Sequence, residues 1–222
     1  LIAMAIGMIG CTNDLVEEVS PIMGQRDVIA VSVDNADTRT AMFGNNVVWS
    51  AGDAIGIFVG ATNNAYALAT GEGTSSAEFQ SEGLVVASVE TLKEAAYFPY
   101  VSTAAWNSST KTITTSLPAT YEYAANTNNN AVMAALMAED AQSSISFQNA
   151  GALYAITVEN ILAGYNKAVM TYLDAEDNVG IAGAATITFV DGVPTLAVPD
   201  AADAASAQKT ITITFTGTDD KT

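Results

Sequence analysis

The sequence contains no histidine and only one cysteine, Cys11, among its 222 residues. Histidine is the commonest general base, cysteine supplies the usual thiolate nucleophile, and both are the typical ligands of zinc. A single cysteine also excludes an internal disulfide, so the hydrophobic core has to stabilise the fold. We therefore expect a protein that is not an enzyme, with no catalytic residues, no metal and no cofactor.

Basic residues are scarce as well. Seven Lys and Arg stand against 24 Asp and Glu, which gives a formal net charge of -17 at pH 7. A charge of this sign repels phosphate backbones, so nucleic acid is excluded as a partner. Hydrophobic residues make up 50% of the chain, whereas disordered chains have low hydrophobicity. The composition predicts a folded protein with an acidic surface.

Residues 1–11 form an apolar run, LIAMAIGMIGC. The run is about half of the roughly 20 residues that a membrane-spanning helix needs, and it matches the apolar core of a secretory signal. Two apolar residues and a glycine precede Cys11 and polar residues follow it, as in bacterial lipoprotein signals, in which the cysteine is acylated. The alternative is a buried cysteine in an apolar strand. We expect residues 1–11 to be a signal remnant, residues 12–26 a tether, and acylated Cys11 a lipid anchor.

Period-two alternation of apolar and polar residues dominates from residue 27 onward and predicts β-strands. Turn-forming residues separate the strands at roughly the 8 to 12 residue spacing of β-sandwich proteins, and Asp191-Gly192 is a hairpin turn signal. The sequence therefore predicts an all-β fold. The expected strands are residues 28–33, 43–49, 54–59, 66–69, 77–79, 84–89, 97–101, 112–117, 145–147, 153–158, 169–173, 179–182, 187–190, 193–198 and 210–216.

In three further stretches the residues give a less decisive signal of secondary structure. Residues 131–140, AVMAALMAED, have helical propensity but end in acids that oppose the helix dipole, so helix and strand stay open there. Residues 174–178 are acidic, but Gly180 comes one place late for a calcium loop, and a hairpin turn fits better. Residues 148–151, QNAG, are expected to form a turn.

Residues 34–40 form a polar segment that contains Arg39. An arginine in an exposed acidic loop is readily reached by a trypsin-like protease, which makes Arg39 a candidate site of proteolytic processing. The alternative is an ordinary solvated charge in a loop. Residues 28–33, the first expected strand, directly precede this segment.

Several motifs occur in a defined order between Cys11 and the C-terminus, and their order and spacing are more specific than any one motif. They are the lipobox at Cys11, Thr38-Arg39-Thr40, Trp49-x-x-Gly52-Asp53-x-Ile55-Gly56-Ile57-Phe58, Tyr97-Phe98-Pro99-Tyr100, Val132-Met133-Ala134 and Ile145-x-Phe147-x-Asn149-x-Gly151-Ala152-Leu153. Together they resemble the fimbrillin family of surface lipoproteins from Gram-negative anaerobes. The resemblance covers residues 11–222.

The resemblance implies two consecutive transthyretin-like β-sandwich domains, residues 27–142 and residues 143–222, the second of them partial. It also implies a strand at residues 131–140 and a subunit of fimbriae at the cell surface, anchored in the outer membrane through Cys11. In the family, an arginine-specific protease cuts an early loop and removes the first strand, and a strand of another subunit replaces it. Arg39 matches that loop. The implied partners are other fimbrial subunits, outer-membrane lipid and a host or glycan receptor.

Two other functions compete with this one. A monomeric surface lipoprotein could bind glycans by stacking sugars on Trp106, Tyr121 and Tyr123, although aromatic residues more often pack in a core or at an edge. A hydrolase would need a pair of catalytic carboxylates. No two acids in the sequence stand apart from ordinary solvated turn charges.

Overall fold

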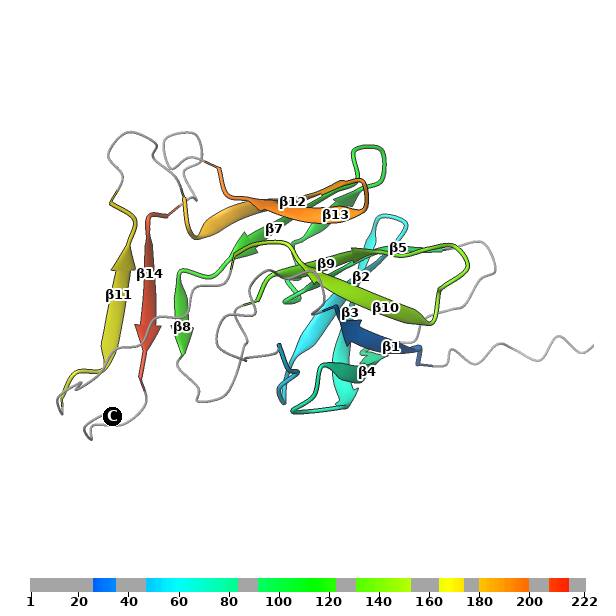
Figure 1. Ribbon diagram of the computed structural model, residues 1–222, viewed down its shortest axis with the longest axis horizontal. Helices are drawn as coiled ribbons and strands as arrows, with labels where there is room; N and C mark the ends of the chain where they lie inside the picture. Colours follow the sequence, from blue (N-terminus) through cyan, green and yellow to red (C-terminus); the bar gives the residue numbers. More distant parts are fainter. Residues whose placement is uncertain are drawn as a thin grey trace, which may run out of the picture.

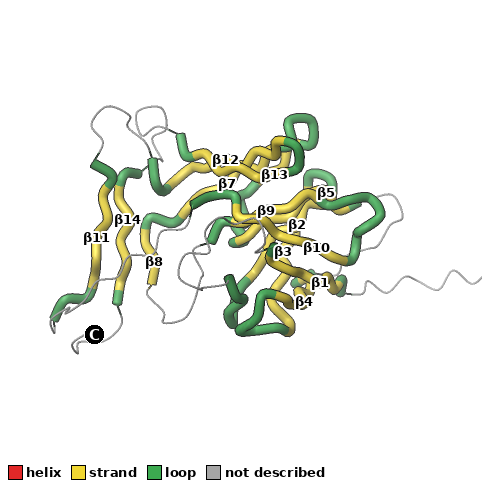
Figure 2. Tube along the Cα trace, viewed as in Figure 1, coloured by secondary structure: helices red, strands yellow, loops and turns green. Residues whose placement is uncertain are grey.

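A computed structural model describes residues 26–34, 47–83, 92–122, 131–152, 164–173, 180–199 and 208–215. Within these ranges every regular element is a β-strand, as Figure 2 shows, and the predicted all-β class is confirmed. None of the described residues forms a helix long and apolar enough to cross a membrane.

Seven strands close into a barrel (Figure 1). The first strand, β1, lies between β10 on one side and β4 on the other. It runs parallel to β10 and antiparallel to β4, so its two edges are both paired. In their order around the barrel the strands are β1 (Val28–Val33), β10 (Ser144–Asn149), β9 (Met133–Leu136), β5 (Lys93–Phe98), β2 (Ala54–Val59), β3 (Thr62–Thr70) and β4 (Ser76–Ser81).

Two smaller sheets complete the described structure. One has the order β13 (Val193–Ala197), β12 (Gly183–Val190), β7 (Thr112–Leu117) and β6 (Ala105–Asn107). The other has the order β11 (Lys167–Thr171), β14 (Thr210–Thr214) and β8 (Thr120–Glu122). In Figure 1 the four-stranded sheet lies across the barrel, and the three-stranded sheet stands at the opposite end of the molecule from β1.

The sheets do not follow the expected boundary between residues 142 and 143. β10 lies beyond that boundary but pairs with β1 and β9 in the barrel. β7 and β8 lie before it but pair with β12 and β14. How the chain divides into domains, and whether those domains are transthyretin-like sandwiches, stay predictions.

The barrel interior is filled by the alternate side chains that the sequence pattern predicts. Ile29 on β1 is 0% exposed, and Trp49 lies among aromatic rings at the centre. The Trp49 ring meets Phe79 at 4.9 Å and Phe98 at 5.3 Å between centroids, in the edge-to-face geometry that aromatic pairs favour. A second core, with Phe58 and Ile187 among its members, joins the barrel to the four-stranded sheet.

Many expected strands are found. The bounds of β1, β2 and β7 are as predicted, Asp191-Gly192 is the turn between β12 and β13, and β14 covers most of residues 210–216. Residues 131–140, left open between helix and strand, contain the strand β9. Expected elements at residues 43–46, 84–89, 153–158 and 174–178 fall outside the described residues.

Four expectations about boundaries are wrong. Residues 47–50 form no strand, although Trp49 exchanges backbone hydrogen bonds with Gly73 and Thr74. β5 begins at Lys93 rather than residue 97, and it ends before the cis peptide bond between Phe98 and Pro99. Residues 148–149 continue β10 instead of turning, because they pair with β9. Residues 180–182 contain only an isolated bridge from Ala182 to Gln208.

Gly56 on β2 is required by a close approach that the sequence did not reveal. A Cβ atom there would overlap Cε1 and Cζ of Tyr97, which faces Gly56 across the β2–β5 pair, and would lie 2.7 Å from the Tyr97 Oη. The Tyr97 ring cannot easily move, because its hydroxyl donates to the Val101 carbonyl at 2.8 Å and accepts from the Asn63 amide at 3.0 Å.

We therefore expect Gly56→Ala to lower the free energy of unfolding by about 1–3 kcal/mol, the usual cost of overpacking. Gly83→Ala is the matched control, because no atom of the described residues lies within 4 Å of the new methyl group, and its effect should be close to zero. Urea denaturation of both variants measures the difference. Equal stabilities of the two variants would contradict the packing of Tyr97 on Gly56.

Candidate functional site

The candidate site is the position of β1 in the barrel, which we call the β1 slot: the space between β4 and β10 that Val28–Val33 fills. Residues 28–32 pair with residues 76–80 of β4, and residues 30–33 pair with residues 144–147 of β10. Because β1 is paired along both of its edges, its removal would open the barrel between β4 and β10.

The inward face of β1 contributes to the barrel core. Ile29, Val31 and Val33 are 0%, 3% and 7% exposed, while Val28, which precedes Ile29 on the other face of the strand, is 46% exposed. The three buried side chains pack in one cluster with Trp49. Without β1, this apolar surface and the backbone edges of both neighbouring strands would face water.

A cluster of polar side chains, which we call the Asp27 latch, fixes the N-terminal end of β1. The Asp27 carboxylate accepts a hydrogen bond from the Tyr66 hydroxyl at 2.7 Å and forms an ion pair with the Lys93 Nζ at 2.8 Å. The Asp27 backbone N–H donates to Ser81 Oγ at 2.9 Å, and the Ser81 N–H donates to the Asp27 carbonyl at 2.9 Å. The latch thus joins the start of β1 to β3, β4 and β5.

Lys93 and Tyr66 are both held in place. The Lys93 Nζ also donates to the Gln142 carbonyl at 2.7 Å, and the Gln142 side chain bonds the Lys93 backbone N–H and carbonyl. Tyr66 is 0% exposed. Burial raises the pKa of Tyr66 above its ordinary value, and the hydrogen bond to Asp27 and the Asp27 charge raise it further.

The raised pKa of Tyr66 predicts a loss of stability in alkali. A tyrosine whose pKa is higher in the folded state contributes stability that is complete below its unfolded pKa of about 10 and is lost as the pH rises above it. At pH 7, Tyr66→Phe should therefore lower the free energy of unfolding by about 1.5–3 kcal/mol, the value of a hydrogen bond to a charged group. Above pH 10 this gap in the free energy of unfolding between the wild-type chain and Tyr66→Phe should narrow by about 1.4 kcal/mol per pH unit.

Urea titrations of the wild-type chain and of Tyr66→Phe between pH 7 and pH 11 measure this gap. A gap that stays constant over the whole range would contradict the bond between Tyr66 and Asp27.

Cys11 and Arg39, the two site residues predicted from the sequence, lie outside the described residues. The described chain does show what surrounds Arg39 in sequence: β1 ends at Val33, and Val47 is the next described residue after Asp34. Arg26 and Arg39 are the two arginines in the sequence, and they flank β1. Sequence reasoning missed Asp27, Tyr66 and Lys93, because no local motif connects residues so far apart in the chain.

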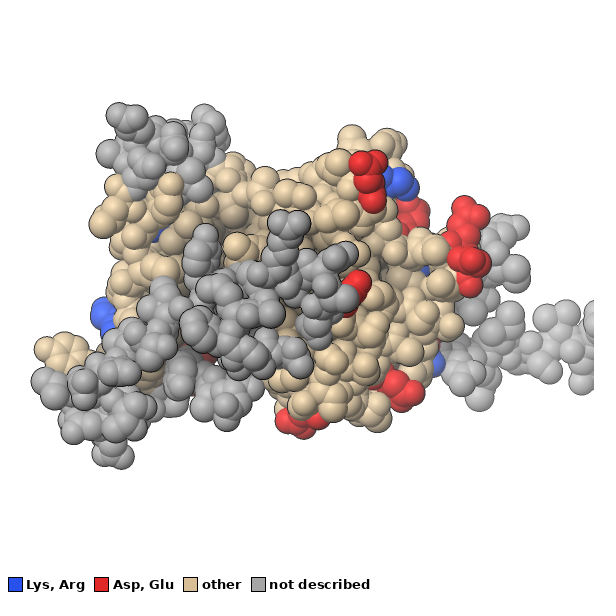
Figure 3. Space-filling view, in the orientation of Figure 1, with Lys and Arg blue, Asp and Glu red and all other residues tan. Residues whose placement is uncertain are grey.

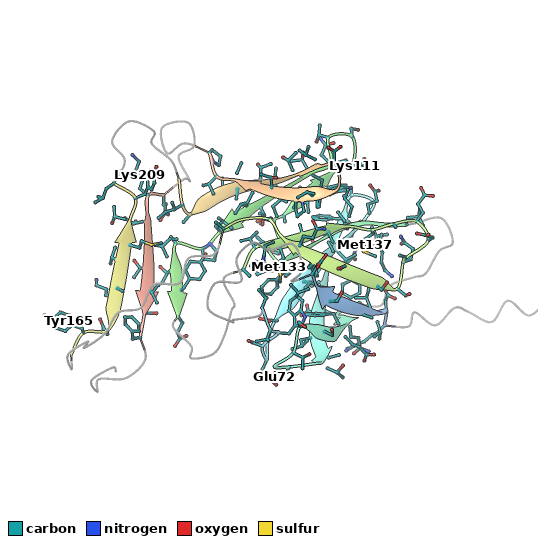
Figure 4. The ribbon with its side chains drawn as sticks, in the orientation of Figure 1. Glu72, Lys111, Met133, Met137, Tyr165 and Lys209 are labelled. Carbon is teal, nitrogen blue, oxygen red and sulfur yellow. The ribbon has the colours of Figure 1, made fainter. Side chains whose placement is uncertain are left out.

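The aromatic residues proposed as a glycan platform are not gathered on one exposed face of the described structure. Trp106 is 9% exposed, its indole N–H donates to Glu94 at 2.8 Å, and its ring stacks on Phe58. Lys111, labelled in Figure 4, lies over the same ring with its Nζ 5.7 Å from the centroid. Tyr121 is partly buried, and Tyr123 lies outside the described residues.

Tyr165, also labelled in Figure 4, is 65% exposed beside β11, far from Lys111 in that view. The sequence gives no signal that separates it from other loop tyrosines.

Acidic side chains are spread over the barrel part of the face shown in Figure 3, and basic ones appear at few points. Within the described ranges, no group of three or more His, Cys, Asp or Glu residues is placed to hold a metal ion.

No family model, curated protein or solved structure matches the chain. The sequence motifs and the geometry of the β1 slot are the features that bear on its function.

Proposed function

We propose that this protein is a structural or adhesive subunit of cell-surface fimbriae that assembles by β-strand donation. It is exported as a lipoprotein anchored in the outer membrane through Cys11. Cleavage at Arg39 then releases β1, and a strand from another subunit enters the β1 slot. The observation that carries the proposal is the position of β1: it is the first strand of the described residues, and it lies between β4 and β10, so that its removal would open the barrel.

The position of Arg39 fits this role. Arg39 follows β1 and precedes every other described strand, so one cut there separates β1 from all the barrel strands that it contacts. The remaining six barrel strands, β2 to β5 with β9 and β10, would stay on one continuous chain.

Loss of β1 would leave unpaired strand edges and an exposed apolar surface, and another strand could cover both. Two rows of backbone groups, on β4 and on β10, would lose their partners, and exposed strand edges readily pair with other chains. The apolar surface vacated by Ile29, Val31 and Val33 would also face water. A donated strand with alternating apolar side chains would satisfy the backbone edges and cover that surface together.

The rest of the proposal follows the resemblance to fimbrillins. The chain would form two transthyretin-like domains, and its partners would be other fimbrial subunits, outer-membrane lipid and a host or glycan receptor. The alternative is a monomeric surface glycan-binding lipoprotein. The packing of Trp106 in the second core removes one of the three aromatic residues on which that alternative was built.

Treatment with an arginine-specific protease tests the proposal. The Arg26→Lys chain, which confines cutting to Arg39, is expected to give SDS-resistant ladders of subunits after treatment and none before it. A chain with Arg26→Lys and Arg39→Lys is the uncut control and should stay monomeric. Cleavage at Arg39 without any ladder would contradict assembly by strand exchange and favour the monomeric alternative.

A further inference from the structure

Donors from three strands converge on Asp27, the residue immediately before β1. We propose that Lys93 and Tyr66 form a carboxylate-binding site, next to the Ser81 bonds to the Asp27 backbone, and that this site selects the strand allowed to fill the β1 slot. The inference rests on the proposed function and specifies the partner: an extended segment of another subunit that carries Asp or Glu two residues before the first of three alternating apolar side chains.

Lys93 and Tyr66 lose the Asp27 carboxylate when β1 leaves. The Lys93 side chain is 14% exposed, and Tyr66 is fully buried. Without Asp27, the Lys93 Nζ keeps one hydrogen bond among the described residues, to the Gln142 carbonyl, and the Tyr66 hydroxyl has no other acceptor among them. A cation or hydroxyl left without its partner at a largely buried site is costly, so a strand that brings a carboxylate is favoured over one that does not.

The Asp27 carboxylate also sets the register of the strand in the slot. Asp27 has the same parity as Ile29, Val31 and Val33, so its carboxylate lies on the inward face of the strand. A slip by one residue would turn every inward side chain outward. A carboxylate that must meet Lys93 and Tyr66 therefore fixes both which residues enter the barrel and how far the strand is inserted.

The C-terminal strand of another copy lacks the acidic residue. The C-terminal strand β14 of another copy has Ile211, Ile213 and Phe215 at the same alternation, but the position equivalent to Asp27 is Lys209. In that register its ammonium group would face the ammonium group of Lys93, and like charges at close range repel. The site should therefore admit an acidic strand more readily than β14 of a second copy.

Peptide uptake by a nicked full-length chain tests the selection. A recognition sequence for a site-specific protease is inserted after Arg39, so the nick does not depend on cleavage at Arg39 itself. Fluorescent peptides of residues 26–35 are added, with the natural sequence or with Asp27→Asn, and uptake is followed by anisotropy. For the Asp27→Asn peptide we expect half-saturation at about a tenfold higher concentration of the nicked chain, which is the effect of losing one charge-assisted hydrogen bond. A second pair, residues 208–215 with or without Lys209→Asp, should show the same preference for the acid.

Variants of the nicked chain show whether Lys93 causes the preference for the acidic peptide. Lys93→Met should reduce the preference for the acidic peptide to about twofold or less, whereas Lys93→Arg, which keeps the charge, should retain it. Equal uptake of both peptides in each pair would overturn the selection and leave strand exchange standing. A preference that persists in Lys93→Met would also overturn it. If no peptide enters the slot, both the selection and strand exchange are contradicted.

Discussion

Replacing Ile29 with aspartate is expected to lower the free energy of unfolding by about 4 kcal/mol or more. Ile29 is 0% exposed on the inward face of β1, so the new carboxylate would be buried among apolar side chains without a partner. A loss of this size is a large share of the 5–15 kcal/mol by which domains are typically stable, so much of the chain should be unfolded at 37 °C.

Val28→Asp is the matched control, because Val28 is the neighbouring residue on the same strand but is 46% exposed. Its effect should stay within about 1 kcal/mol, as for a surface substitution. Urea denaturation followed by circular dichroism measures both variants. Equal tolerance of the two substitutions would show that β1 does not contribute its inward face to the barrel core.

The second large effect is expected at Trp49. Replacing Trp49 with alanine should cost about 3–5 kcal/mol, because the cavity it leaves is surrounded by rings that cannot collapse together. Those rings belong to Phe79, Phe98 and Phe147, the last at 6.0 Å between centroids. The backbone hydrogen bonds of Trp49 do not depend on its side chain and should survive.

Trp49→Phe should be clearly less damaging than Trp49→Ala. It keeps an aromatic ring among the others, and it removes the indole Nε1, a buried donor without a hydrogen-bond partner among the described residues. Thermal unfolding of the two variants checks the order. A Trp49→Phe chain as unstable as the alanine variant would contradict the placement of the unbonded indole in the core.

The sequence predicts best where one side of a strand is buried and the other faces water. The alternation in residues 28–33 and in residues 112–117 sets the bounds of β1 and β7 correctly, and Asp191-Gly192 sets the turn that follows β12. These signals are local, because a period of two follows directly from the geometry of a strand.

Local signals leave a segment open, or misplace its bounds, where distant parts of the chain decide the outcome. Residues 131–140 have helical propensity, but the pairing of β9 with β5 and β10 overrides it. β5 starts earlier than predicted because Lys93 and Glu94, which look like loop residues, have partners in Asp27 and Trp106. Local propensity contains no information about such partners.

The candidate site could be predicted only in part for the same reason. Residues 28–33 and Arg39 are visible as a strand followed by a cleavable segment. The pairing of β1 with β10 across more than a hundred residues, and the meeting of Asp27 with Tyr66 and Lys93, become visible only in three dimensions. These non-local contacts make β1 the strand that closes the barrel.

The most direct test of the central claim is to lock β1 in its slot. Ala30 and Glu78 face each other on β1 and β4 with exposed side chains, and facing positions of this kind suit an engineered disulfide. A chain with Cys11→Ala, Arg26→Lys, Ala30→Cys and Glu78→Cys is oxidised and then cut at Arg39. We predict no SDS-resistant ladder until a reductant opens the disulfide. Ladders that form equally well with the disulfide intact would show that assembly does not require β1 to leave.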